Sequence, residues 1–273
     1  MKILITGADG FIGSSLVDHF QEKGHDVYLG NRKNLDLLNE DCVSSFFEKK
    51  HIDVVVHAAI QGGRRTKNDD SAVFYNNLLM FENIFKYRNK FNAFINLASG
   101  AEYDRRQDID SVREEDLGKS IPIDFYGFSK FIIAQRTRDF EYGYNLRIFN
   151  CFGKNEAPDR MIKASFQNSF NQDPIVVHKN RFMDFFFIED LCRVVEFYIE
   201  NLKEKKPKDV NMSYSEKIDL LSLASLIKSV TSSDSDILLL NKGADKSYTG
   251  NSDILMSLGI ALGGINQSLY TYL

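Results

Sequence analysis

The chain has 273 residues, of which 43% are hydrophobic and 26% charged, and its formal net charge is −4. This is long enough to bury one large core, or a nucleotide-binding domain with a smaller lobe, and the composition is that of an ordinary globular protein. The slightly acidic charge argues against a nucleic-acid partner. Neither a secretion signal nor an apolar run of about 18 residues is evident, so we expect no membrane association.

The cysteine pattern argues against structural cross-links. Cys42, Cys151 and Cys192 are far apart in the sequence and show no metal-ligand spacing. A disulfide framework and a metal site are therefore not expected, and the pattern fits a reducing compartment. The sequence predicts a cytoplasmic protein without a bound metal.

The first half of the chain alternates short apolar runs with longer amphipathic stretches. The apolar runs predict strands over residues 2–6, 27–29, 53–57, 93–98 and 145–150. The amphipathic stretches predict helices over residues 11–23, 40–50 and 72–87, and another that begins near Tyr126. Repeated strand–helix units of this kind predict an α/β fold, a Rossmann-type doubly wound parallel sheet.

After Cys151 the alternation becomes irregular. Helices are predicted over residues 160–170 and 219–230, and strands over residues 175–178, 182–188 and 236–241. A charged stretch over residues 202–209 is interpreted as a solvated connector. We expect a dinucleotide-binding domain over residues 1–150, to which residues 182–201 return. Residues 151–181 and 202–273 would then form a small C-terminal substrate-binding lobe.

Three glycines stand between the first predicted strand and the first predicted helix. Gly7, Gly10 and Gly13 lack a Cβ, so backbone N–H groups in this turn can approach a pyrophosphate closely. The N-terminus of the following helix adds partial positive charge at the same place. The position of the turn predicts a dinucleotide site in preference to a purely structural turn.

A tyrosine and a lysine are spaced one helical turn apart. Tyr126 and Lys130 lie on one helix face, and their helix follows the strand that ends at Ser99. In an open parallel sheet, ligands bind at this end of the strands. A neighbouring ammonium is expected to lower the pKa of the phenol toward neutrality. Ser99, Tyr126 and Lys130 are therefore predicted to exchange a proton with a carbonyl oxygen while hydride moves to or from its carbon.

These motifs resemble the extended short-chain dehydrogenase/reductases, a family of NAD(P)-dependent epimerases, dehydratases and reductases that act on nucleotide sugars. The resemblance extends over nearly the whole chain and is closest to GDP-fucose synthase-like ketoreductases. The matching segments are Gly7-x-x-Gly10-x-x-Gly13, Ser99-x-x-x-Tyr103, Tyr126-x-x-x-Lys130, Arg147-x-x-Asn150-x-x-Gly153 and a closing segment from Asn251 to Gly259.

The resemblance implies a set of binding residues. Those for the cofactor are Gly7, Gly10, Phe11, Ile12, Gly13, Asn31, Arg32, Asp36, Leu37, Ala58, Ala59, Asn77 and Lys130. Those for the nucleotide-sugar substrate are Gly62, Gly63, Asn150, Arg160 and Arg181. Arg181 stands two positions before the usual place of the family's arginine, where this chain has Met183.

The residues after the second predicted strand bear on the choice of cofactor. NAD-specific members of the family usually carry an acid there, which binds the ribose 2′-hydroxyl. This chain has Asn31-Arg32-Lys33 instead, and Arg32 would accept a 2′-phosphate. The sequence therefore predicts that NADP(H) is preferred, with NAD(H) possible.

The residues beside Ser99 bear on the type of reaction. Dehydratases of the family place Asp-Glu directly after the catalytic hydroxyl, where this chain has Gly100 and Ala101. Glu102 is one position further and is expected to face away from the site. Epimerase–reductases use a cysteine and a histidine, whose approximate places are taken here by Ala101 and Arg160. Neither dehydration nor epimerisation beside the ketone is expected.

The sequence thus predicts NADPH-dependent reduction of the 4-keto group of a nucleotide-linked 4-keto-6-deoxy sugar, in deoxysugar or surface-polysaccharide biosynthesis. Two alternatives stay open: an NAD-dependent nucleotide-sugar 4-epimerase and a non-catalytic dinucleotide-binding sensor. The resemblance also implies a homodimer. His57 is expected to have its hydrogen bonds satisfied, Cys151 to be a packed thiol, and neither to take part in catalysis.

Overall fold

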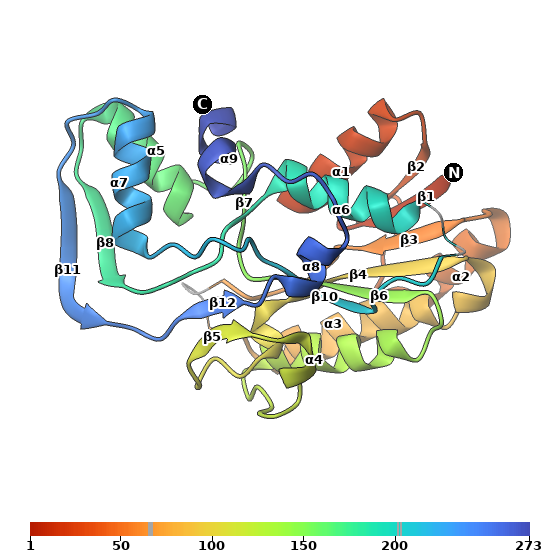
Figure 1. Ribbon diagram of the computed structural model, residues 1–273. Coiled ribbons are helices and arrows are strands. Elements are labelled where there is room, and N and C mark those ends of the chain that lie inside the picture. The colour runs from red at the N-terminus through yellow and green to blue at the C-terminus, as the bar shows by residue number, and fades with distance from the viewer. Residues whose placement is uncertain (65–67, 201, 203) are drawn as a thin grey trace.

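A computed structural model describes residues 1–64, 68–200, 202 and 204–273 of the chain (Figure 1). Residues 201 and 203, beside and within the predicted charged connector, lie outside this described part. The main sheet has six strands in the order β10-β6-β4-β3-β1-β2. All neighbouring strands in it are parallel, which confirms the predicted doubly wound α/β fold. The strands are β1 (Lys2–Thr6), β2 (Asp26–Gly30), β3 (Val54–His57), β4 (Ala93–Ser99), β6 (Gly143–Ile148) and β10 (Asp209–Met212).

Helices cover both faces of this sheet (Figure 1). On one face lie α1 (Phe11–Glu22) and α6 (Ile188–Ile199), and on the other α2 (Glu40–Lys49), α3 (Ser71–Phe85) and α4 (Phe125–Arg138). Successive residues of a strand point to opposite faces, so Ile3 and Ile5 join one apolar cluster and Leu4 the other. Since both faces are buried, the central strands are almost continuously apolar, and this made them recognisable in the sequence.

The order of the strands determines where a ligand can enter. The chain passes from β1 to β2 on one side and then crosses to β3 on the other side of β1. Connections leave the sheet in opposite directions at this switch point, and a crevice opens at the carboxyl ends of the strands there. The fold therefore places the glycine turn after β1 at the mouth of the crevice.

Smaller elements stand beside this end of the sheet. The pair β8 (Ile175–Asn180) and β11 (Ile237–Ala244) packs against α5 (Met161–Asn171) and α7 (Leu220–Val230). Two further pairs are β5 (Ile109–Val112) with β12 (Tyr248–Gly250) and β7 (Cys151–Phe152) with β9 (Phe186–Phe187). The chain closes with α8 (Asp253–Ser257) and α9 (Gly264–Tyr272), and short 3-10 turns are η1 (Arg88–Lys90), η2 (Gly100–Glu102) and η3 (Glu114–Asp116).

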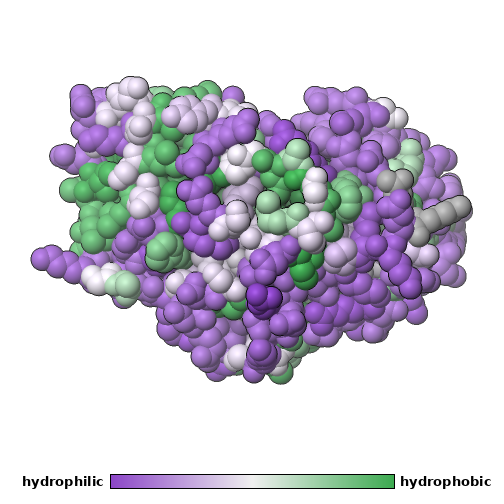
Figure 2. All heavy atoms as spheres, viewed as in Figure 1, coloured by the Kyte–Doolittle hydropathy of each residue, from purple (hydrophilic) through white to green (hydrophobic). Residues whose placement is uncertain are grey.

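One outer face of these smaller elements is apolar. Figure 2 shows hydrophobic residues gathered at the left of the view, where α7, β8 and β11 lie in Figure 1. Three consecutive leucines of β11 are exposed there, Leu238, Leu239 and Leu240. None of the helices in the described part of the chain is both long and apolar enough to cross a membrane.

Two expectations about the second half were wrong. The strand predicted over residues 182–188 is reduced to β9, which pairs with β7 outside the main sheet, because the chain turns into α6 at Ile188. The sixth strand of the main sheet is instead β10, which pairs with β6. It lies within the range that the sequence assigned to the smaller lobe.

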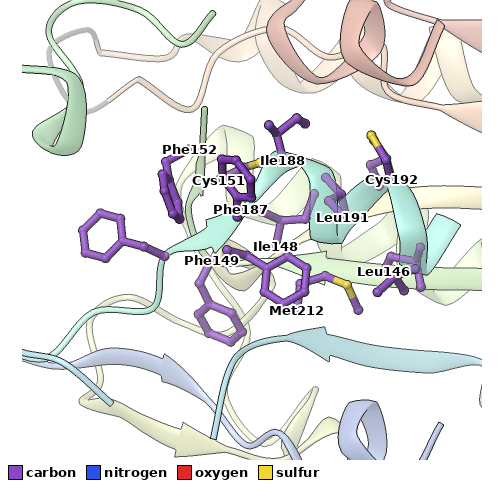
Figure 3. Packing of buried hydrophobic residues seen from close by; sticks show 14 of the residues in the cluster. Leu146, Ile148, Phe149, Cys151, Phe152, Phe187, Ile188, Leu191, Cys192 and Met212 are labelled. Atoms are coloured by element: carbon purple, nitrogen blue, oxygen red, sulfur yellow. The ribbon is translucent and has the colours of Figure 1, made fainter. Parts of the chain in front are cut away.

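Apolar packing joins the main sheet to the segments that leave it (Figure 3). Leu146 and Ile148 of β6 share one buried cluster with Cys151, and with Leu191 and Cys192 of α6. Burial raises the pKa of the Cys151 thiol well above its usual value and that of Cys192 to about 12. Both thiols are therefore protonated packing groups near neutral pH, as predicted for Cys151.

Candidate active site

A cavity of about 860 Å³ lies at the carboxyl ends of the main-sheet strands and is closed on its other side by the smaller elements. Most of the predicted site residues line it. They are Gly7, Gly10, Phe11, Ile12, Gly13, Asn31, Arg32, Asp36, Leu37, Ala58, Ala59, Gly63, Ser99, Tyr126, Lys130, Asn150, Arg160 and Arg181. Gly62 and Asn77 are not among its lining residues.

The glycine turn is a close contact between β1 and α1. Gly7 has a φ of +65°, and a Cβ built on Gly13 would stand 2.1 Å from the Gly7 carbonyl oxygen. Gly10 precedes α1 without a side-chain cap on the first N–H groups of the helix. Uncapped N–H groups at a helix N-terminus, in a turn without side chains, are suited to a pyrophosphate. The turn therefore fits the dinucleotide that the family motifs imply.

The residues after β2 line the same cavity. The Asn31 side chain donates a hydrogen bond to an Asp9 oxygen at 2.9 Å, so these two side chains bind one another. Arg32 is exposed and lines the cavity, whereas Lys33 does not. Leu37 is buried beside it. Of the two cations that the sequence singled out, only Arg32 is placed to meet a ligand.

Side chains beneath β3 hold the next loop. Thr6 Oγ1 accepts hydrogen bonds from the backbone N–H groups of Ala58 and Ala59, both at 3.1 Å. Asn77 accepts a hydrogen bond from the Gln61 N–H at 2.8 Å and donates one to the Gln61 carbonyl oxygen at 3.1 Å. Asn77 is fully buried, so its position indicates that it fixes the loop behind the cavity wall.

His57 is only partly satisfied, which corrects the expectation from the sequence. Its Nδ1 is 3.0 Å from Thr6 Oγ1, but its Nε2 is buried and has no hydrogen-bond partner among the described residues. Burial lowers the pKa of His57 to about 3, and the charge of Lys130 acts in the same direction. The imidazole is therefore neutral at all ordinary pH values.

The structure brings the three predicted catalytic residues together. Ser99 ends β4, and its hydroxyl accepts the Ala101 N–H at 3.1 Å and makes a hydrogen bond with the Tyr126 hydroxyl. Tyr126 lies in the first turn of α4, where the Asp124 cap accepts the Gly127 N–H at 2.8 Å. A Cβ at Gly63 would be 2.7 Å from the Tyr126 ring, so this glycine allows the ring to lie against the loop.

Burial sets the pKa values of this group. It raises the pKa of Tyr126, and the hydrogen bond from Ser99 only partly opposes that shift. It lowers the pKa of Lys130 to about 8, while the negative charge of Glu102 opposes the change. The sequence predicts a phenol whose pKa is lowered by Lys130, and the structure shows the opposite direction. The reason is that Lys130 donates to the Leu97 carbonyl oxygen at 2.7 Å, and Ser99 is the hydrogen-bond partner of the phenol.

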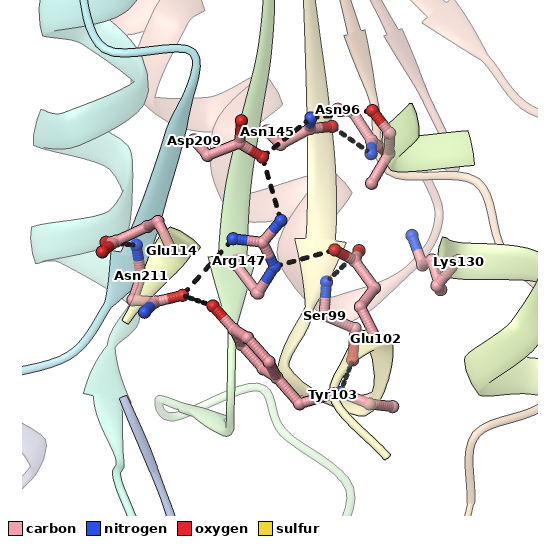
Figure 4. A network of polar contacts seen from close by, with 12 residues as sticks. Asn96, Ser99, Glu102, Tyr103, Glu114, Lys130, Asn145, Arg147, Asp209 and Asn211 are labelled. Carbon is pink, nitrogen blue, oxygen red and sulfur yellow. Dashed lines mark hydrogen bonds and ion pairs between the residues drawn. The ribbon is translucent and has the colours of Figure 1, made fainter. Parts of the chain in front are cut away.

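Glu102 lies behind Ser99, as Figure 4 shows. One carboxylate oxygen accepts the Ser99 N–H at 2.9 Å, and the other accepts Arg147 Nε at 2.7 Å. The expectation that Glu102 faces away assumed a strand, but the residue belongs to the turn η2. Its carboxylate is fully buried against Arg147, and Glu102 is not among the residues that line the cavity.

Several lining residues had no signal in the sequence. Tyr248 of β12 lines the cavity and makes a hydrogen bond with Ser99. Glu156 lines it too, and burial raises the pKa of its carboxyl to about 7. Other lining residues outside the predicted set are Gln61, Arg64, Arg105, His178, Lys179 and Met183. They come from loops and short strands that no motif marks.

The predicted substrate cations meet acidic neighbours. Arg160 Nε is 3.9 Å from a Glu156 oxygen, and Arg181 is 3.5 Å from an Asp245 oxygen. Asn150 donates to the Asp184 carbonyl oxygen at 2.8 Å. These contacts hold the three side chains along the cavity wall opposite the glycine turn. No cluster that could hold a metal ion is present within the described ranges.

Comparisons with known proteins agree with this site. The chain is 25% identical over 237 residues to GDP-L-colitose synthase from Yersinia pseudotuberculosis, which covers 78% of this chain and 76% of that protein. GDP-L-fucose synthases are also among the relatives.

Solved structures share the fold over the whole chain. A GDP-mannoheptose C4 reductase from Campylobacter jejuni with NADP bound has a TM-score of 0.82 and 20% identity, covering 99% of this chain and 97% of that one. UDP-glucose 4-epimerase with UDP-glucose from Thermotoga maritima has a TM-score of 0.83 and 19% identity, covering 100% and 97%. At such identities the likeness shows the fold alone.

The assignment to a family rests on the match to residues 3–213, which is most of the chain. That range includes the glycine turn, Ser99, Tyr126 and Lys130, which are the residues that suggested the family in the sequence. By this match the chain belongs to the NAD dependent epimerase/dehydratase family.

Proposed function

We propose that this protein is an NADP(H)-dependent reductase of the 4-keto group of a nucleotide-linked 4-keto-6-deoxy sugar. The observation that carries the proposal is the hydrogen bond between Ser99 and a protonated Tyr126 at the wall of the cavity. The two positions after Ser99, Gly100 and Ala101, carry no titratable group, so they cannot expel a hydroxyl or exchange a carbon-bound proton.

The chemistry of the step follows from these groups. Ser99 and Tyr126 donate hydrogen bonds to the carbonyl oxygen and stabilise the negative charge that develops on it. The nicotinamide cofactor, when bound, supplies the hydride to the carbonyl carbon. Tyr126 then gives its proton to the oxygen, and its raised pKa makes sure that it holds that proton beforehand. Lys130 places a positive charge close to the resulting phenolate.

The ends of the cavity support the choice of ligands. Arg32 is the cation beside the predicted adenosine end, and it fits a 2′-phosphate. Arg160, Lys179 and Arg181 lie on the wall formed by the smaller elements and fit a nucleotide diphosphate. The C4 reductase from Campylobacter jejuni, whose fold is similar, binds NADP, and this favours the same cofactor here.

We also propose that the protein is a cytoplasmic homodimer. Members of the family pair through two long helices, which correspond here to α3 and α4. Tyr75 on α3 is 64% exposed, and Phe125 on α4 is 43% exposed. Aromatic side chains of this kind are typical of interfaces.

A panel of GDP-, dTDP-, CDP- and UDP-linked 4-keto-6-deoxy sugars, mixed with NADPH and the purified protein, tests the activity. We expect stoichiometric loss of nicotinamide absorbance with one nucleotide series, which also identifies the base. Interconversion of 4-epimers by protein with tightly retained NAD would replace the reductase by an epimerase. Cofactor binding without any turnover would instead favour a sensor.

Replacing Tyr126 tests the proposed acid. Tyr126→Phe keeps the ring against Gly63 but removes the proton donor, so we expect turnover to fall by about 10²- to 10⁴-fold. Affinity for NADPH, measured by fluorescence titration, is expected to stay within about twofold, because the change is confined to one hydroxyl group. Turnover close to that of the unmodified protein would rule out this mechanism.

A further inference from the structure

We propose that Tyr248, on the C-terminal strand β12, is a positioning residue that fixes the direction in which Ser99 donates its proton. Its effect on rate rests on the proposed reductase, whereas its hydrogen bond to Ser99 does not. Tyr248 lies far from Ser99 in the sequence and belongs to none of the predicted motifs.

Two phenols meet on one serine. The Ser99 hydroxyl makes hydrogen bonds with the hydroxyls of Tyr126 and Tyr248, and all three residues line the cavity. A Cβ built on Gly100 would stand 2.8 Å from the Tyr248 hydroxyl. The glycine after Ser99 therefore leaves the room that the second phenol needs, which gives a physical reason for its lack of a side chain.

The hydrogen-bonding capacity of serine turns this contact into a direction. A hydroxyl donates one hydrogen bond and accepts two. The Ala101 N–H takes one acceptor position of Ser99, at 3.1 Å. When the Tyr248 O–H takes the other, the serine proton is left for Tyr126 or for the carbonyl oxygen of the substrate.

The same arrangement holds through the proton transfer. The O–H bond of Tyr126 breaks and a new O–H bond forms on the substrate oxygen, while Ser99 and Tyr248 keep their own protons. Ser99 then donates to the Tyr126 phenolate, and Tyr248 still donates to Ser99. Tyr248 thus supports the donor without touching the reacting atoms.

The position of Tyr248 is set by contacts other than Ser99. Its N–H donates to the Phe182 carbonyl oxygen at 2.9 Å, and its own carbonyl oxygen accepts the Asp184 N–H at 3.1 Å. Its ring packs edge-on against Phe149 with 5.2 Å between centroids. Because only 7% of the residue is exposed, burial raises the pKa of its phenol, which remains a donor at working pH.

A double-mutant cycle measures the coupling. Tyr248→Phe keeps the packing against Phe149, and we expect it to lower kcat about tenfold with KM nearly unchanged, as for the loss of one hydrogen bond. In a Ser99→Ala background the same change is expected to alter the residual kcat less than about twofold. An equal loss in both backgrounds would show that Tyr248 acts without Ser99 and would overturn the proposal.

A matched control separates this effect from a general loss of a buried hydroxyl. Tyr198 is fully buried and donates to the Pro207 carbonyl oxygen at 2.9 Å, away from the cavity lining. Tyr198→Phe is expected to leave kcat unchanged. A loss equal to that of Tyr248→Phe would assign both effects to stability and contradict the positioning role.

A measurement without substrate keeps the two proposals distinguishable. In protein labelled with ¹³Cζ-tyrosine, the resonances of Tyr126 and Tyr248 are assigned from their phenylalanine variants. Ser99→Ala is expected to shift both resonances, since both phenols lose the same partner. If only the Tyr126 resonance moves, Tyr248 is not bound to Ser99 and the inference fails, whether or not any keto-sugar is reduced. If both move and no sugar is turned over, the reductase fails and the hydrogen-bonded pair stands.

Discussion

At the scale of single residues, Arg32 is the side chain on which the choice of cofactor depends. It lines the cavity after β2, whereas the adjacent Lys33 does not. We expect Arg32→Ala to weaken NADPH binding at least about tenfold and to leave NADH binding within about twofold, because only NADPH carries a 2′-phosphate for the guanidinium. Fluorescence titration with both cofactors measures this. Lys33→Ala removes the same charge and is the control; equal losses for both cofactors would contradict the assignment.

Glu156 is expected to make stability depend on pH. Burial raises the pKa of this carboxyl from 4.5 to about 7 in the folded state. As the pH rises from 4.5 to 7, the unfolded chain loses this proton first, so the contribution of Glu156 to the free energy of unfolding falls. Glu156→Gln is therefore expected to stabilise the protein at pH 8 by up to about 3 kcal/mol and to have little effect near pH 4. Urea unfolding at both pH values tests this, and a gain of similar size at pH 4 would refute it.

The residues of the site differ in how far the sequence could predict them. Ser99, Tyr126 and Lys130 lie near one another because their spacing and the end of β4 require it, and a motif reveals this. Tyr248 reaches Ser99 only through the pairing of β12 with β5, a contact between distant segments. The pKa direction of Tyr126 was also beyond reach, since it depends on burial and on which carbonyl Lys130 binds.

At the scale of elements, the junction of β1 and α1 depends on contacts that only glycine allows. A Cβ on Gly13 would stand 2.1 Å from a backbone oxygen, so strand and helix would have to separate. We expect Gly13→Ala to raise the Kd for NADPH more than about tenfold and to cost about 1–3 kcal/mol of stability. Gly24→Ala is the control, because nothing lies within 4 Å of its Cβ and only its positive φ is strained. An unchanged Kd in Gly13→Ala would show that the turn does not cradle the cofactor.

The strands that the sequence missed have an identifiable reason. β10 alternates polar and apolar residues, and its Asp209 and Asn211 are within hydrogen-bonding distance of Arg147. A strand that pairs its polar side chains with a buried arginine gives no continuous apolar run. Conversely, the apolar residues of 182–188 suggested a strand, but two of its phenylalanines, Phe185 and Phe186, belong to the buried cluster where the chain crosses to α6.

At the scale of the whole molecule, one buried arginine joins the catalytic turn to the far edge of the sheet (Figure 4). Arg147 of β6 is fully buried and pairs with Glu102 at 2.7 Å and with Asp209 of β10 at 3.0 Å. Glu102 in turn holds the Ser99 N–H. The order of the catalytic turn and the attachment of the last strand therefore depend on the same side chain.

Removing this arginine leaves two carboxylates without their shared partner. We expect Arg147→Met to lower the free energy of unfolding by about 3–5 kcal/mol, because a buried charge that loses its partner must be desolvated alone. Urea unfolding followed by circular dichroism measures the loss. Adding Glu102→Gln removes the fully buried carboxylate, so the double variant is expected to regain part of that stability, whereas Glu102→Gln by itself is expected to destabilise the protein. If the two substitutions simply add, Arg147 acts by filling volume in the sheet, and the ion pair does not couple the catalytic turn to β10.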